Sequence, residues 1–324
     1  MVVSQNSKDV IKIFQNIKDI PISTNLDDGN LNIFMCPINA RKFDYNQISL
    51  VLVDSVIDYA ISKKNITKYQ NKPGRLSQIA RKKFKEYLNN TGELGELLLY
   101  CFLEGHLNAP KILTKMEMKT SNKMYVNGSD GVHLLSNCDG TYKLIFGESK
   151  LYKNISDALY EAFKSINDFI NEINASGENK SGINYEKDLI SSNIDNFELS
   201  DEDKVILEFI IYPSKNEKKL HIDDAFSIFI GYEIDISEET KKCTSSDFID
   251  EVKKKILLEL DSFENKVYKK INDNNLLGHT FFVYIVPFTD IDNTRRKILE
   301  DILTWIILLL NFQKKHLKTN IWSI

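Results

Sequence analysis

The sequence predicts an α/β protein in which helices flank a mixed central β-sheet. Apolar segments of strand length alternate along the chain with longer segments of helical periodicity, which is the element order of such folds. One strand segment, Leu144–Phe146, has no polar face and should therefore be covered on both sides, as in the middle of an α/β sheet. Asp139-Gly140 precedes it and is a hairpin signal, so this strand and the one before it should be antiparallel neighbours.

The first part of the chain is predicted to be mainly helical. Lys72-Pro73-Gly74 breaks the chain before a basic helix, and Asn90 or Thr91 can cap the helix that begins at Glu93. The predicted helices here cover residues 8–20, 47–63, 76–88 and 93–103, and one strand covers residues 31–35.

Strands and helices alternate in the rest of the chain. The polar segment 175–195, which contains several glycines and serines, is interpreted as a long loop or an insertion. Strands are predicted over residues 113–119, 131–135, 142–150, 205–212, 225–232 and 280–287, and helices over 156–173, 246–272 and 292–312.

Length and composition are those of an ordinary globular protein. The 324 residues can bury a full core as one large domain or two modest ones. We predict a single elaborated domain over residues 1–324, with a motif core at about 90–170. The additions at 1–89 and 190–324 could form a partner interface or simply complete the core.

Cysteine usage and hydropathy indicate a cytoplasmic protein. The 4 cysteines are widely spaced and form no CxxC pair, which argues against a structural zinc site and a disulfide framework. The N-terminal residues lack the apolar core of a signal peptide. The most apolar run, Ile302–Leu310, is roughly half the length needed to cross a bilayer, so we expect a buried helix and no membrane partner.

Basic residues are concentrated in one part of the chain. The formal net charge is -4, yet residues 61–90 contain nine lysines and arginines and the single acid Glu86. This segment could face the phosphates of a nucleic acid, or it could be a solvated helix face balanced by acids elsewhere. The residues proposed to contact nucleic acid here are Arg75, Arg81, Lys82, Lys83 and Lys85.

Three charged residues mark the ends of two neighbouring strands. Asp130 opens the strand that begins at Gly131, and Glu148 and Lys150 close the next strand. Because strand side chains alternate, Glu148 and Lys150 should share one face while Ser149 points away. The antiparallel hairpin should bring Asp130 toward Glu148.

These residue types suit a divalent metal site. Magnesium prefers hard oxygen ligands and usually takes one or two carboxylates, which Asp130 and Glu148 could supply, while Ser149 could add its backbone carbonyl. Lys150 could hold a water molecule and neutralise charge that builds on a phosphate. Mg²⁺ is the expected metal, and Mn²⁺ is an alternative.

The helix before these strands offers a further acid. Glu93 and Glu96 are three residues apart and lie near one helix face. We favour Glu96, because Leu97 and Leu98 define a buried side next to it. Glu93 could instead be a first-turn acid that complements the helix dipole.

Residues after Lys150 could contact a nucleic-acid strand. Tyr152 and Lys153 lie at a strand-to-helix turn, where Lys153 could meet a phosphate, although both could equally be ordinary surface residues. His133 should lie on the strand face opposite Asp130, so we interpret it as a core or supporting histidine.

The order of these motifs along the chain resembles that of the PD-(D/E)xK nuclease superfamily. A helix with Gly-Glu-x-Gly-Glu comes first, an Asp that opens a strand follows, and Glu-x-Lys closes the next, apolar strand. No proline precedes Asp130, which departs from its most familiar pattern. Three segments narrow the resemblance to the HamA family, the nuclease subunit of the Hachiman anti-phage system. They are Gly92–Tyr100, the Gly-Ser-Asp-Gly-Val-His segment 128–133 and Phe-Gly-Glu-Ser-Lys at 146–150.

The resemblance implies a function and a partner. Asp130, Glu148 and Lys150 match the catalytic core of the family, with Glu96 or Glu93 as the helix acid. It implies a metal-dependent DNA endonuclease that is restrained by HamB, a superfamily 2 helicase. Glu178-Asn179-Lys180 lacks the glycine that precedes the lysine in a Walker A motif, so an ATP-driven motor would be another chain. The alternatives are a catalytically inactive DNA-binding or regulatory subunit and a stand-alone restriction endonuclease.

Overall fold

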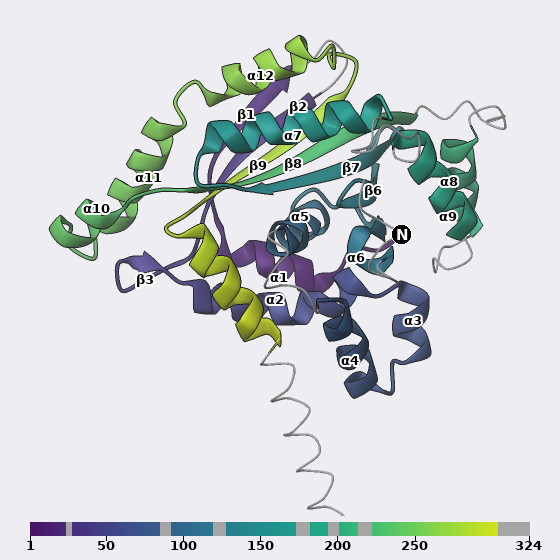
Figure 1. Cartoon of the computed structure of the whole chain (residues 1–324), viewed down its shortest axis with the longest axis horizontal. Helices are drawn as coiled ribbons and strands as arrows, with labels where there is room; N and C mark the ends of the chain where they lie inside the picture. The colour runs from purple at the N-terminus through teal and green to yellow at the C-terminus, as the bar shows by residue number, and fades with distance from the viewer. Residues whose placement is uncertain are drawn as a thin grey trace, which may run out of the picture.

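A seven-stranded sheet lies between two layers of helices (Figure 1). The computed structural model describes residues 1–23, 28–84, 92–118, 128–172, 182–193, 201–212 and 222–303 of the chain. The strand order is β1-β2-β9-β8-β7-β6-β5. The predicted mixed α/β class is therefore confirmed, and the architecture is compatible with a nuclease-like core.

The sheet has a parallel centre and antiparallel edges. Neighbours β2, β9, β8 and β7 run parallel, whereas β1 pairs antiparallel with β2 at one side and β6 and β5 continue antiparallel from β7 at the other. The strands are β1 (Gln15–Ser23), β2 (Asp28–Met35), β5 (Lys111–Thr114), β6 (Gly131–Ser136), β7 (Tyr142–Leu151), β8 (Ile222–Glu233) and β9 (Thr280–Phe288). A separate two-stranded sheet joins β3 (Ile38–Asn39) to β4 (Lys42–Phe43).

Helices cover both faces of the sheet, as the all-apolar strand predicted. On one face α5 (Glu93–Gly105) packs against β7 and β8 and is backed by α1 (Gln5–Ile13) and α2 (Tyr45–Ala60). On the other face lie α7 (Ile155–Ile170) and α12 (Phe263–Asp273). The remaining labelled helices are α3 (Lys63–Lys68), α4 (Pro73–Lys83), α6 (Lys115–Met118), α8 (Ile183–Asn193), α9 (Asp201–Ile211), α10 (Ser237–Lys242) and α11 (Phe248–Glu259).

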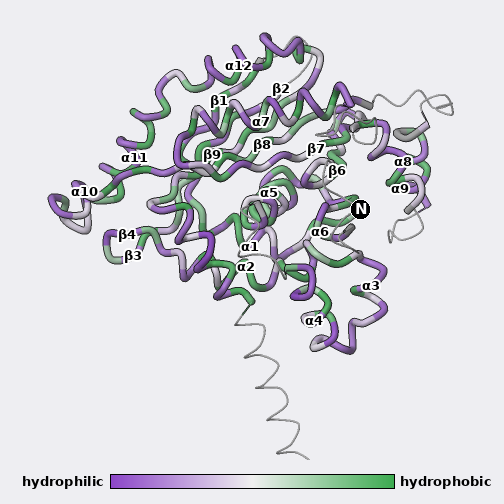
Figure 2. The backbone as a smooth tube through the Cα atoms, in the orientation of Figure 1, coloured by the Kyte–Doolittle hydropathy of each residue, from purple (hydrophilic) through white to green (hydrophobic). Residues whose placement is uncertain are grey.

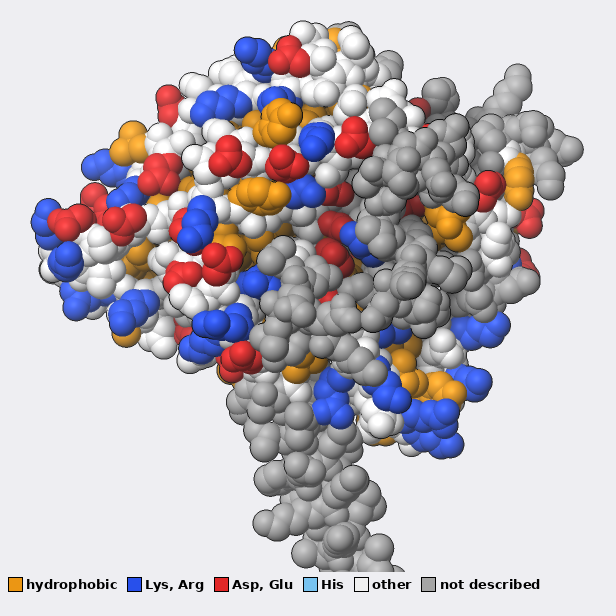
Figure 3. All heavy atoms as spheres, viewed as in Figure 1, with side chains coloured by type: hydrophobic (Ala, Val, Ile, Leu, Met, Phe, Trp, Pro, Cys, Tyr) orange, Lys and Arg blue, Asp and Glu red, His pale blue; other side chains and the backbone are white. Residues whose placement is uncertain are grey.

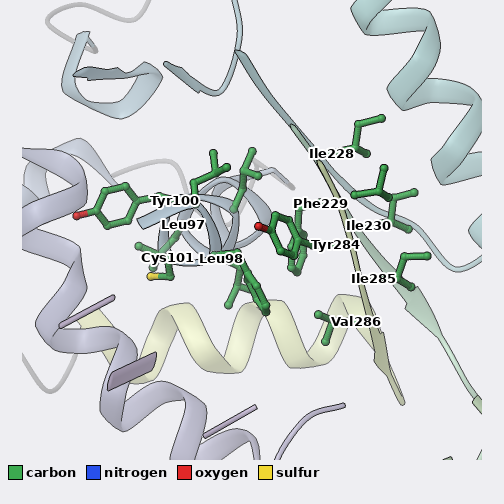
Figure 4. Close-up of a cluster of buried hydrophobic side chains, with 14 of the residues drawn as sticks. Leu97, Leu98, Tyr100, Cys101, Ile228, Phe229, Ile230, Tyr284, Ile285 and Val286 are labelled. Atoms are coloured by element: carbon green, nitrogen blue, oxygen red, sulfur yellow. The ribbon is translucent and has the colours of Figure 1, made fainter. Parts of the chain in front are cut away.

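The main core lies between α5 and the parallel strands. Hydrophobic segments concentrate in α5 and the central strands, and hydrophilic ones at the periphery (Figure 2). Phe229 and Tyr284 are register partners on β8 and β9 and lie between the strands and α5, whereas Ile228 and Ile230 project from the other face (Figure 4). The ring of Phe102 on α5 lies 5.0 Å from that of Tyr284. This packing fixes α5 against the sheet.

Gly95 sets how closely α5 approaches the end of β7. A Cβ atom added at Gly95 would lie 3.1 Å from the Oγ of Ser149 and 3.3 Å from a side-chain carbon of Leu151. The absence of a side chain therefore lets the first turn of α5, which carries Glu93 and Glu96, lie directly over the charged end of β7.

Several predicted elements are wrong in type. A strand is predicted over residues 205–212, but the helix α9 covers Asp201–Ile211. Three acids in its first turn, at positions 201–203, favour the helix through its dipole. The predicted helix 8–20 ends at Ile13, and edge strand β1 follows, where Pro21 is tolerated.

Three other predictions are wrong in extent. The segment 175–195, interpreted as a long loop or an insertion, contains the helix α8, so the loop alternative is wrong. The strand predicted over 113–119 covers Lys111–Thr114 and gives way to α6. The long helix predicted over 246–272 is two helices, α11 and α12, separated at Ser262, whose φ of 56° is left-handed. Part of the predicted helix 292–312 lies outside the described residues.

Candidate active site

The β6–β7 hairpin places Asp130 beside the end of β7. Gly131 is the register partner of Gly147, and the Asp130 N–H donates to the Gly147 carbonyl oxygen at 2.8 Å. The tight turn has Gly140 at φ 83°, as the Asp-Gly pair predicted. Asp130 itself is buried, with 7% of its surface exposed. The predicted antiparallel pairing is therefore confirmed.

Ser149 orients the Asp130 carboxylate. Oδ2 of Asp130 accepts hydrogen bonds from the Ser149 N–H at 2.8 Å and from the Ser149 Oγ at 2.7 Å. The side chain of Ser149 is on the α5 side of β7 and is buried. The sequence suggested only a backbone carbonyl role for this residue, and that role stays a prediction.

Glu148 and Lys150 form an ion pair on the opposite side of β7. The Nζ of Lys150 lies 2.5 Å from Oε1 of Glu148, and the two side chains are 19% and 15% exposed. Burial and the nearby Asp130 raise the pKa of Glu148. Burial alone would lower the pKa of Lys150, but Glu148 outweighs it and the pKa is raised. The lysine is therefore held as a cation next to two carboxylates.

Both candidate helix acids are buried in the first turn of α5. Oε2 of Glu96 accepts a hydrogen bond from the hydroxyl of Tyr59 at 3.0 Å, and Oε1 lies 3.9 Å from the Nζ of Lys115. Glu93 is fully buried. Lys115 links Glu96 to Asp130, which favours Glu96 over Glu93 as the acid that completes the site.

Lys115 is a site residue that sequence reasoning missed. Its Nζ lies 3.3 Å from Oδ1 of Asp130, and its N–H donates to the Asp130 carbonyl oxygen at 3.1 Å. The prediction of a strand through residue 119 concealed it, because strand alternation does not apply where α6 begins at Lys115.

Glu186 on α8 is a second residue that the sequence did not reveal. It is fully buried and accepts hydrogen bonds from the N–H of Ser129 at 2.5 Å and from the Ser129 Oγ at 2.7 Å. Since Ser129 directly precedes Asp130, α8 holds the turn that aims the aspartate. Because the segment 175–195 was interpreted as a long loop or an insertion, no helix face was considered there that could have singled out Glu186.

The predicted basic surface divides into exposed and structural residues. Lys and Arg side chains gather where α3 and α4 lie (Figure 3), and Arg75 and Lys82 are exposed there. The Arg75 guanidinium lies 4.3 Å from the centre of the Tyr69 ring. Lys83 instead donates to the carbonyl oxygens of Met116 and Glu117 on α6, and Arg81 is half-buried. Lys85 lies outside the described residues.

Tyr152 and Lys153 follow directly from the charged end of β7. Tyr152 is 38% exposed, and its N–H donates to the Gly231 carbonyl oxygen. Lys153 lines a cavity of about 800 Å³ that is also lined by Lys42, Tyr45 and Glu233. This cavity lies at the carboxyl ends of β7, β8 and β9, the edge at which α/β sheets commonly bind ligands.

His133 is a core residue, as predicted. It is buried in β6, and its Nδ1 lies 2.8 Å from the Ala109 carbonyl oxygen and therefore donates to it. Burial, reinforced by Lys111 and Lys63, lowers the pKa of His133 to about 4.

The donor chemistry fits a divalent metal only in part. Asp130 and Glu148 offer two hard carboxylates on adjacent strands, which suffices for Mg²⁺ when water and phosphate complete its shell. Among the described residues, however, no group of three or more His, Cys, Asp or Glu side chains is arranged to hold a metal ion. Cations of the protein itself, Lys115 and Lys150, lie against the acids.

The sheet and its flanking helices define a mixed α/β protein whose architecture is compatible with a nuclease-like core. A family comparison gives the particular group: the HamA family model matches residues 10–302, so the chain belongs to the HamA family of Hachiman anti-phage defence proteins. The resemblance seen in three short segments is thereby confirmed over most of the chain. No curated protein matches the chain significantly. None of the described helices has both the length and the apolar composition required to span a bilayer.

Proposed function

We propose that this Hachiman protein is a metal-dependent DNA endonuclease that hydrolyses phosphodiester bonds and is restrained by a helicase partner. The observation that supports the proposal most is that the β6–β7 hairpin places Asp130 beside the end of β7, where Glu148 and Lys150 form an ion pair. Family membership adds the defence context.

In the proposed reaction, Asp130 and Glu148 would hold Mg²⁺ or Mn²⁺. The metal would supply Lewis-acid polarisation of the scissile phosphate. Ser149 keeps the Asp130 carboxylate in one orientation through two hydrogen bonds. Lys150 would hold the attacking water and neutralise negative charge as it accumulates on the phosphate. Glu96, held by the Tyr59 hydroxyl, would orient water at the opposite side of the site.

The exposed basic residues of α3 and α4 would contact DNA phosphates without reading sequence. Lys153, which lines this cavity and follows Lys150 by only three residues, would contact the strand as it leaves the site. A helicase chain would supply the ATP-driven motor.

Plasmid nicking by the purified chain, alone and with its helicase partner, tests the proposal. With Mg²⁺ or Mn²⁺, the wild-type protein should convert supercoiled plasmid to the nicked form. The double variant Glu148→Gln with Lys150→Met should reduce the rate of nicking by at least about a hundredfold, because a group that stabilises charge in the transition state is lost. Lys164→Met, at an exposed position of α7, is the matched control and should cleave like wild type.

Two results would decide against the proposal. Equal cleavage by wild type and the Glu148/Lys150 variant would place the activity elsewhere. Metal-dependent DNA binding without cleavage, both alone and in the helicase complex, would favour the inactive regulatory subunit instead.

A further inference from the structure

Lys115 is bound at both ends to Asp130. Its backbone N–H donates to the Asp130 carbonyl oxygen, and its ammonium lies 3.3 Å from Oδ1 of the same residue. The ammonium also lies 3.9 Å from Oε1 of Glu96. Its side chain is 22% exposed. The residue therefore bridges Asp130, which precedes β6, and Glu96 on α5.

Lys115 is the cation that compensates the negative charges of Asp130 and Glu96. Buried carboxylates are strongly destabilising unless a cation or several hydrogen bonds compensate them. Glu148 already pairs with Lys150 at 2.5 Å. The Lys115 ammonium lies against both remaining acids, so it supplies the positive charge that compensates their burial.

The ammonium faces the carboxylate oxygen on which a metal would have to bind. Oδ2 of Asp130 already accepts two hydrogen bonds, from the N–H and the Oγ of Ser149. Oδ1 is the oxygen that faces Lys115. A divalent ion and the ammonium would compete for Oδ1, because two cations cannot share one carboxylate oxygen without strong repulsion.

We propose that Lys115 is an internal counter-ion that occupies the cation position beside Oδ1 of Asp130 and has to leave it before a divalent metal binds this carboxylate. This inference rests on the proposed metal-dependent function. Lys115 is thus a positioning residue that sets metal affinity.

Mn²⁺ titration by calorimetry tests the inference without any measurement of cleavage. Lys115→Met removes the competing charge and should tighten Mn²⁺ binding by at least about tenfold, which corresponds to roughly 1.4 kcal/mol. Lys115→Arg retains the charge and should bind Mn²⁺ nearly as wild type does. Lys164→Met, remote and exposed, should also match wild type.

A thermal measurement separates competition from loss of packing. In EDTA, Lys115→Met should melt below wild type, because Asp130 and Glu96 lose their cation. Saturating Mn²⁺ should restore the melting temperature of the variant more than that of wild type. Lys115→Gln, checked by circular dichroism, replaces the methionine variant if the latter fails to fold.

The outcomes distinguish this inference from the proposed function. If Lys115→Met binds Mn²⁺ with unchanged or weaker affinity while wild type binds and cleaves, the counter-ion role is wrong and the nuclease proposal stands. If neither wild type nor the variant binds Mn²⁺ and neither cleaves, both are wrong.

Discussion

The Oγ of Ser129 lies 2.7 Å from a carboxylate oxygen of Glu186, a residue 57 positions later in the chain. Through this hydrogen bond α8 holds the turn that precedes Asp130. An element that the sequence presents as an insertion therefore supports the candidate active site directly.

Replacing Glu186 should impair the site without altering its charged residues. Glu186→Gln keeps one acceptor oxygen but loses the charge, so we expect cleavage to fall about tenfold, in the range of lost hydrogen bonds to charged groups. DNA affinity should be unchanged, as measured by fluorescence anisotropy. Asp188→Asn, at an exposed position of the same helix, is the control. Equal cleavage by the Gln variant and wild type would show that the turn keeps its geometry without α8.

Gly105→Ala should destabilise the fold where α1 crosses α5. A Cβ atom at position 105 would clash with the Ser7 carbonyl oxygen, which belongs to a helix backbone and cannot rotate away. Forced overpacking of this kind costs about 1–3 kcal/mol, and urea denaturation measures it. Gly278→Ala meets no atom within 4 Å and should change stability by less than about 0.5 kcal/mol. If Gly105→Ala and Gly278→Ala were equally stable, α1 and α5 would not pack as closely at Gly105 as the structure shows.

Acid should destabilise the protein partly through His133. The pKa of His133 is lowered to about 4 in the folded state, whereas an unfolded histidine titrates near its ordinary value of 6.5. Between pH 6.5 and 4 the histidine is therefore protonated in the unfolded state but not in the folded state. This contribution, up to about 3 kcal/mol, is complete above pH 6.5 and is lost as the pH falls to 4.

Urea unfolding of wild type and His133→Phe between pH 7 and 4 measures the effect. The variant should lose less stability than wild type over this interval, even if it is less stable at pH 7. Parallel curves for the two proteins would mean that His133 takes up its proton without opening the core.

Charge reversal on α4 tests the basic surface. The double variant Arg75→Glu with Lys82→Glu should weaken DNA binding. The slope of the logarithm of the binding constant against the logarithm of the salt concentration should fall in magnitude by roughly one for each phosphate that the variant no longer neutralises. Lys254→Glu, at an exposed position of α11, is the matched control. Lys83 is excluded because its ammonium holds the α6 carbonyl groups, so its reversal would disturb Lys115 as well. Unchanged DNA binding together with failure to form the helicase complex would make this surface a partner interface instead.

The sequence was sufficient for the central elements and their charged ends. The unbroken apolar run of β7 and the Asp-Gly turn are strong local signals, so they predicted the buried strand, its hairpin and the position of Asp130 beside Glu148. The HamA resemblance, read from three segments, extends over residues 10–302.

The supporting residues could not be predicted because they depend on tertiary structure. Lys115 reaches the site only because β5 ends one residue earlier and α6 turns the chain. Glu186 does so only because α8 packs against the turn before Asp130. β-branched and aromatic residues make up most of residues 205–212 and favour a strand, whereas the acidic first turn of α9 is the weaker signal.

The hairpin of β6 and β7 also has a consequence for how the protein is made. Asp130 and Glu148 are 18 positions apart, so they can meet as soon as this local hairpin closes on the growing chain. The parallel neighbour of β7 is β8, which begins only at Ile222. Until β8 has been synthesised, one edge of the apolar strand β7 has no partner strand. The nascent chain is therefore prone to aggregation during that interval.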